Sequence, residues 1–107
     1  MSVTVDALDE LAAVCANAAA MEEGGLTYIY LPRIVLPDGG DAEALLCLSG
    51  RDGYPTRLFL SRRVSGKGNN WSVHRIFDKA WHTWSWRDVP ADLRPIEVLS
   101  SHLGALR

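Results

Sequence analysis

The sequence predicts one α+β domain in which an N-terminal helix, an antiparallel meander of three to four strands, a tryptophan-rich segment and a C-terminal helix follow one another. Near both ends of the chain, apolar residues recur at three- and four-residue steps, which is the period of a helix. Between them, apolar runs alternate with turn-forming sequence, as in a meander. With 107 residues, the chain suits one hydrophobic core rather than two, so residues 1–107 are expected to form a single domain.

Helices are expected over residues 5–22 and 95–106. The pair Gly24-Gly25 follows the first stretch as a stop signal, and Pro95 suits the first turn of the second. The apolar stripes consist of Val5, Leu8, Leu11, Ala12, Cys15, Ala18 and Ala19 in the first helix and of Ile96, Leu99, Leu103 and Leu106 in the second.

Strands are expected where β-branched, aromatic or aliphatic residues cluster between turns. The expected strands cover residues 26–36, with a bulge or an edge position at Pro32, then 42–49 and 57–61, and the turns between them cover 37–41 and 51–53. Tight turns of this kind join antiparallel neighbours and need no crossover helix.

Charge and composition exclude several classes of function. The net charge is −2, and the basic residues cluster only at Arg62, Arg63 and Lys67, so no nucleic-acid partner is expected. No apolar run approaches the roughly 20 residues of a membrane span, and the N-terminus lacks a signal-peptide pattern. We therefore expect a cytoplasmic protein without a membrane partner. Cys15 and Cys47 have no second ligand at metal-binding spacing, so neither a metal site nor a cofactor is expected.

The middle of the chain resembles the ubiquitin-conjugating (E2) superfamily. The resemblance is carried by residues 44–49 followed by Tyr54-Pro55, and by the run 81–86, Trp-His-Thr-Trp-Ser-Trp, which is similar to an element of bacterial E2-like proteins. Arg57 and Leu58 stand where the family has further prolines. The resemblance implies a UBC/RWD-like fold, and as partners a ubiquitin-like protein, an E1-like enzyme or another subunit of that pathway.

The thioester chemistry of that family requires an accessible thiol after the third strand, and residues 57–107 contain no cysteine. Cys15 lies on the apolar stripe of a helix and Cys47 inside an apolar strand. Both positions are typical of buried cysteines that act as small apolar side chains. Thioester carriage is therefore not expected, although Cys47 stays a weak catalytic candidate.

Hydroxyl and imidazole side chains offer a second set of weak catalytic candidates. Ser72 is two residues from His74, and Ser85 is three residues from His82, so each pair is a candidate nucleophile and base. No third orienting group is identifiable in the sequence. The competing interpretation is that the serines satisfy backbone groups in loops.

The segment 71–86 is the strongest candidate for binding a partner. If residues 81–86 are extended, one face carries His82, Trp84 and Trp86, and the other carries Trp81, Thr83 and Ser85. So small a core has little room for both faces, and exposed tryptophan is favoured at interfaces. The competing interpretation is a second small core. The candidate partner-binding residues are Trp71, His74, Trp81, His82, Trp84 and Trp86.

The leading interpretation is a non-catalytic E2-like scaffolding subunit of a bacterial ubiquitin-like conjugation pathway, for which the resemblance implies a role in antiphage defence. One alternative is an atypical E2-type transferase that carries the ubiquitin-like protein on a cysteine or serine. The other is an unrelated small α+β domain that dimerises through its tryptophans.

Overall fold

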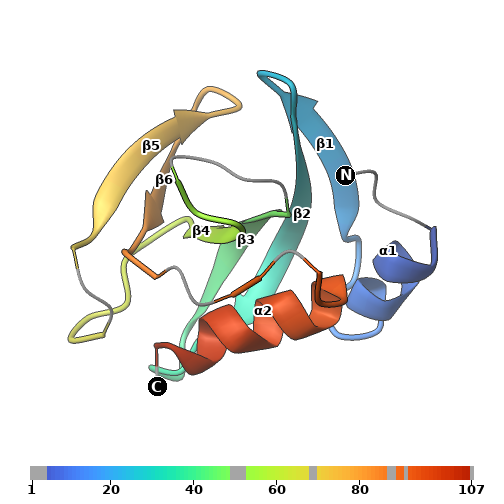
Figure 1. Ribbon diagram of the computed structural model, residues 1–107. Coiled ribbons are helices and arrows are strands. Elements are labelled where there is room, and N and C mark those ends of the chain that lie inside the picture. Colours follow the sequence, from blue (N-terminus) through green and yellow to red (C-terminus); the bar gives the residue numbers. More distant parts are fainter. Residues whose placement is uncertain (1–4, 49–52, 68–69, 87–88, 91, 107) are drawn as a thin grey trace.

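The computed structural model describes residues 5–48, 53–67, 70–86, 89–90 and 92–106 (Figure 1). Its elements are α1 (Val5–Ala12), β1 (Ala19–Glu23), β2 (Leu26–Val35), β3 (Asp41–Cys47), β4 (Arg57–Leu60), β5 (Ser72–Ile76), β6 (Lys79–Thr83) and α2 (Pro95–Gly104). The α+β class and the presence of a helix near each end of the chain are as predicted. Ser49 and the expected turn at residues 51–52 lie outside the described residues.

All described strands form one antiparallel sheet in the order β1-β2-β3-β4-β6-β5. The expected three to four strands are therefore too few: the sheet has six. The predicted bulge near Pro32 is present, since the β2–β3 register shifts between Leu31 and Ile34. Figure 1 shows the sheet curled into a half-barrel, with the helices on its outer side and the hairpins β1–β2 and β5–β6 as its two arms.

The first helix is shorter than predicted, because α1 ends at Ala12 and residues 19–23 form β1. Asn17, five residues after the end of α1, adopts a left-handed conformation (φ 66°) that a helix continuing to residue 22 would not contain. Gly24 and Gly25 have φ of 62° and 79° and join β1 to β2 as a two-residue hairpin loop. The glycine pair is thus a hairpin turn rather than a helix stop.

Side chains of the two sheet faces enter two separate cores, because neighbouring residues of a strand point in opposite directions. The helix-side core lies between the outer face of the sheet and both helices, and it includes Leu11, Ile29, Leu46, Leu58, Trp84, Val98 and Leu99. The sheet-side core lies on the inner face and consists of Tyr28, Leu45, Cys47, Phe59, Ile76 and Trp81, with Leu26, Tyr30 and Phe77 packed against it.

The turn of the β5–β6 hairpin contacts the β1–β2 hairpin, which is the other arm of the half-barrel. Its turn residues Phe77 and Asp78 both have positive φ, 52° and 57°, a conformation that costs about 1–3 kcal/mol for residues of this kind. The Phe77 ring packs edge-on against Tyr28 with centroids 5.6 Å apart, and the Phe77 N–H donates to the Glu23 carboxylate. These contacts with the opposite arm offset the strain of the turn.

Candidate functional site

Both thiols are buried, as predicted. Cys15 is 3% exposed, and its S–H donates to the Arg33 carbonyl at 3.1 Å. Cys47 is fully buried in the sheet-side core. An electrophile the size of a protein C-terminus has no route to either sulfur in this conformation, so the thiols act as small core side chains.

The sequence-predicted pair Ser72 and His74 does come together. Both side chains lie on one face of β5, and Ser72 Oγ is 3.1 Å from His74 Nε2. The His74 ring also contacts Phe59 edge-on, with centroids 5.5 Å apart. A hydrogen-bonded hydroxyl and imidazole are two parts of a nucleophile site.

The second proposed pair, Ser85 and His82, is separated by the strand geometry. Ser85 Oγ accepts a hydrogen bond from the Tyr54 hydroxyl at 3.3 Å. His82 of β6 pairs with Leu60 of β4 on one side and with Val73 of the edge strand β5 on the other. Its Nδ1 atom is buried and has no hydrogen-bond partner among the described residues. No described contact joins these two side chains.

Most of the tryptophan surface is used for packing. Trp81 and Trp84 are each 3% exposed and belong to different cores, in keeping with the predicted alternation of faces. Trp71 is partly buried and packs on Trp84 with centroids 5.2 Å apart. Trp86 is the most exposed of the four, at 37%. Trp86 is therefore the tryptophan that offers an accessible ring to a partner.

The Tyr-Pro turn anchors a buried arginine. Tyr54 is itself buried, and the guanidinium carbon of Arg57 lies 3.9 Å from the centre of its ring. Arg57 is 5% exposed, and such stacking stabilises a desolvated cation. The turn thus has a structural role at the start of β4.

A buried polar cluster beneath α2 has no counterpart in the sequence-based expectations. The Thr56 hydroxyl donates to the Val89 carbonyl at 2.7 Å and lies 2.9 Å from His102 Nε2. Because the single hydroxyl proton goes to Val89, His102 Nε2–H must be the donor to Thr56. His102 is only 1% exposed, and burial followed by the nearby Arg57 charge lowers its pKa to about 4.

On the inner face of the half-barrel, Glu43 links the two arms. It accepts a hydrogen bond from the Tyr30 hydroxyl at 2.6 Å and pairs with Lys79, whose ammonium lies 4.9 Å from the centre of the Trp81 ring. The hydrogen bond from Lys79 is the main cause of the lowered pKa of Glu43, and the hydrogen bond to Glu43 is the main cause of the raised pKa of Tyr30. Every polar group in this cluster has a partner, so its evident role is to close the arms.

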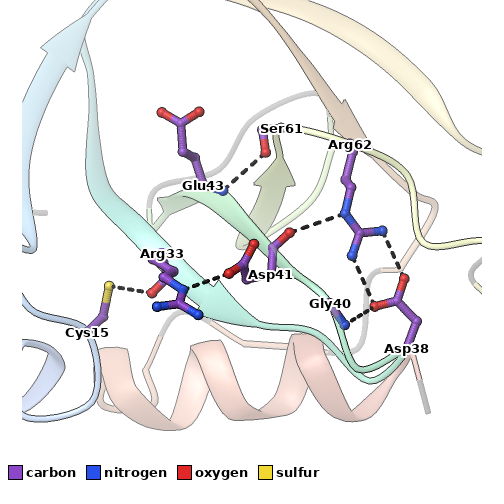
Figure 2. A network of polar contacts seen from close by, with 8 residues as sticks. All are labelled: Cys15, Arg33, Asp38, Gly40, Asp41, Glu43, Ser61 and Arg62. Atoms are coloured by element: carbon purple, nitrogen blue, oxygen red, sulfur yellow. Dashed lines mark hydrogen bonds and ion pairs between the residues drawn. The ribbon is translucent and has the colours of Figure 1, made fainter.

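Figure 2 shows a second polar network, at the β2–β3 turn. Arg62 Nη1 and Nη2 donate to the two carboxylate oxygens of Asp38 at 2.8 and 3.0 Å, and Arg62 Nε donates to the Asp41 carbonyl at 3.2 Å. A Cβ at Gly40 would come within 2.5 Å of Arg62 Nη2. The Arg62 hydrogen bonds lower the pKa of Asp38 to about 2. The turn is thus fixed by a bidentate pair between its own Asp38 and Arg62, the second residue after β4.

Arg62→Ala is expected to raise the Asp38 pKa from about 2 toward its ordinary value near 3.8, because the two charge-assisted hydrogen bonds are lost. A lowered carboxyl pKa stabilises the fold above the ordinary pKa, and this stabilisation is lost as the pH falls from about 4 toward 2. The side-chain carboxyl ¹³C shift of Asp38, followed by NMR against pH, measures the change. Arg33→Ala is the matched control, since Arg33 pairs with Asp41 and should leave the Asp38 titration in place.

An open apolar groove lies on the outer side of the molecule. Its volume is about 240 Å³, and it runs between α2, the end of β2 and the segment after α1. It is lined by Val14, Ile34, Val35, Ile96, Leu99, Ser100 and Leu103. Val14 and Val35 are 65% and 70% exposed, the highest values among the large apolar residues described. No local sequence pattern marks this groove, because its lining comes from three separate segments of the chain.

Within the described part of the chain, no three histidine, cysteine, aspartate or glutamate side chains are grouped so as to hold a metal ion. None of the helices described there has the length and apolarity needed to cross a membrane. In comparisons with known proteins, no family model, no curated protein and no solved structure matches this chain significantly.

Proposed function

We propose that this chain is a non-catalytic protein-binding domain that acts as an E2-like scaffolding subunit in a bacterial ubiquitin-like conjugation pathway. The burial of both thiols is the observation that carries the non-catalytic part. The open apolar groove, with two of its valines mostly exposed, supports the binding part. The UBC/RWD-like assignment and the pathway rest on the sequence resemblance at Tyr54-Pro55 and residues 81–86.

The proposal is tested by mixing the chain with ATP and with a ubiquitin-like protein and an E1-like enzyme encoded in the same genome. We expect a non-covalent complex by size-exclusion chromatography and no covalent adduct on denaturing gels. A thiol-sensitive adduct that disappears in Cys47→Ser would overturn the non-catalytic reading. The absence of any complex would overturn the pathway.

The Ser72–His74 hydrogen bond favours a second candidate, an atypical transferase that carries its cargo as an oxyester. In this candidate Ser72 Oγ attacks the activated C-terminal carbonyl of the ubiquitin-like protein, His74 takes the hydroxyl proton, and the E1 thiolate leaves. The adduct would survive thiol reduction and would be absent in Ser72→Ala. The same mixture, analysed with and without reductant, separates this candidate from the first.

In the folded protein, Cys15 and Cys47 are expected to react with a thiol reagent at least about 100-fold more slowly than in denaturant, because exposing a core side chain costs a few kcal/mol of local opening. The rate of reaction with Ellman's reagent, with and without urea, gives the ratio. The variants Cys15→Ser and Cys47→Ser assign the rate to one sulfur each. A native rate at Cys47 equal to the denatured rate would contradict its burial.

A further inference from the structure

The groove has the shape of a site for a helix. Its α2 wall is formed by Ile96, Leu99, Ser100 and Leu103, which are spaced i, i+3, i+4 and i+7 and so form one stripe along the helix. From Ile96 to Leu103 this stripe extends for about 10 Å at 1.5 Å per residue. Val14, Ile34 and Val35 supply the rest of the apolar lining. An aliphatic stripe along a helix, extended by apolar residues of two other segments, matches the groove type that binds an amphipathic helix.

A small-molecule ligand fits the groove less well. Its volume of about 240 Å³ falls below the roughly 300–1,000 Å³ of sites for drug-sized ligands. Among the described residues of the lining, Ser100 alone has a polar side chain, whereas ligand pockets contain several convergent polar groups that fix orientation. The space suits a few aliphatic side chains inserted from a partner.

An added β-strand is also disfavoured at this side of β2. Pro32 has no N–H to donate, and the Arg33 carbonyl already accepts the Cys15 S–H. Two of the backbone groups that an incoming strand would need are therefore absent or occupied. A helix, whose backbone hydrogen bonds are internal, does not require them.

Two carboxylates lie next in the chain to, or four residues from, residues that line the groove. Arg94 Nη1 donates to Glu10 at 2.8 Å, and Arg94 Nε donates to Glu97 at 3.1 Å, so two carboxylates share one guanidinium. Glu97 adjoins Ile96 on α2, and Glu10 precedes Val14 by four residues. The Glu10 and Glu97 side chains are 37% and 47% exposed. This excess of negative charge can pair with a lysine or arginine of the partner.

We propose that the groove binds an amphipathic helix of a partner protein, which inserts aliphatic side chains between α2 and Val14/Val35 and places a basic residue beside Glu10 and Glu97. This inference rests on the proposed binding function and names the surface and the chemistry of the partner. This surface differs from residues 71–86, the tryptophan-rich segment that the sequence predicts as the partner-binding site. Two of its lining residues, Val14 and Val35, are mostly exposed, so they can be mutated without removal of core packing.

The probe is a set of fluorescein-labelled helical peptides of about 15 residues, near the shortest length at which isolated helices persist in water. Leu, Ile, Val or Met occupies positions i, i+3, i+4 and i+7, and lysines flank this stripe. Control peptides have the same composition in a permuted order that destroys the stripe. We expect saturable fluorescence anisotropy with the striped set only, and amide shift changes at Val14, Val35, Leu99 and Leu103 in NMR spectra.

Val35→Glu and Val14→Glu are expected to weaken peptide binding by about tenfold or more, because each removes an apolar contact and buries a charge. Val73→Glu is the matched control: Val73 is 53% exposed on β5, outside the groove, and should bind as the wild type does. Glu10→Gln should weaken binding by up to about fivefold and reduce its salt dependence.

Three results would overturn the inference: no binding by any striped peptide, equal binding by permuted peptides, or unchanged affinity in Val35→Glu. Self-association that is abolished by Val35→Glu would also overturn it, because a second copy would then occupy the groove. The pathway is tested separately. If the complex with the ubiquitin-like protein persists in Val35→Glu, the proposed function stands without this surface. If the peptides bind and that complex is absent, the groove stands without the pathway.

Discussion

Trp84→Ala is expected to lower the free energy of unfolding by about 3–5 kcal/mol, the usual cost of deleting a buried aromatic side chain. Trp84 is 3% exposed in the helix-side core, where it packs on Trp71 and meets the His102 ring edge-on with centroids 6.1 Å apart. Its indole Nε1 has no hydrogen-bond partner among the described residues. The loss is therefore one of packing, which urea denaturation measures directly.

Trp86→Ala is the matched control, because the same truncation removes a ring that is 37% exposed. We expect it to change the unfolding free energy by about 1 kcal/mol or less. The pair of variants also separates the two roles that the sequence allowed for the tryptophans. If Trp84→Ala removed partner binding while stability stayed at the wild-type value, the core assignment of Trp84 would be refuted.

The local patterns of the sequence predicted which side chains are buried better than they predicted which elements form. Cys15 and Cys47 were placed in the core from their apolar neighbours, and both are buried. Strand alternation likewise placed Trp81 and Trp84 on opposite faces, where they enter different cores. Such predictions need only the period of a strand or helix, which is a local property.

The predicted end of the first helix is wrong, because the same apolar residues fit both a helix and a strand. The alanines after Cys15 continue a helical stripe in the sequence. In the structure, however, Ala19 and Ala20 belong to β1 and pair with Tyr30 and Ile29 of β2. Alanine favours helices, so tertiary pairing with a strongly β-forming strand overrides its propensity. The Gly24-Gly25 pair was the available signal, since two glycines between extended segments are typical of a hairpin loop.

The second hairpin carried no such signal. Its turn is formed by Phe77 and Asp78 in a left-handed conformation that glycine or asparagine usually supplies. The turn is stabilised by contacts with Tyr28 and Glu23, which lie about 50 residues away in the chain. Strain that distant residues compensate cannot be read from local sequence, so the sequence predicts neither β5 nor β6 and indicates a smaller sheet.

The candidate sites that the sequence predicts are formed by residues close together in the chain, and the sites that it does not predict are formed by distant residues. Ser72 and His74 are two residues apart on one strand, so their contact follows from strand geometry and was anticipated. The groove joins Val14, Val35 and α2, and the Thr56–His102 contact spans 46 residues. Both depend on how the helices dock on the sheet, which no motif in this sequence encodes.

The buried histidine should make the protein acid-sensitive in a defined pH range. Burial, followed by the nearby charge of Arg57, lowers the His102 pKa to about 4 from an ordinary value of 6.5. Between these values the unfolded chain binds a proton that the folded chain excludes, so stability falls as the pH decreases from about 6.5 to 4 and is fully present above that range. A difference of this size corresponds to about 3 kcal/mol.

His102→Gln is expected to remove this part of the pH dependence, because an amide does not titrate, while its N–H₂ can still donate to Thr56. Unfolding free energies from urea titrations at intervals between pH 4 and 7 give the slope for wild type and variant. His74→Gln is the control, since it makes the same replacement at a partly exposed strand position and leaves His102 in place. If the wild type and His102→Gln lost stability equally between pH 6.5 and 4, His102 would not be the neutral, buried donor that holds Thr56 and Val89 beneath α2.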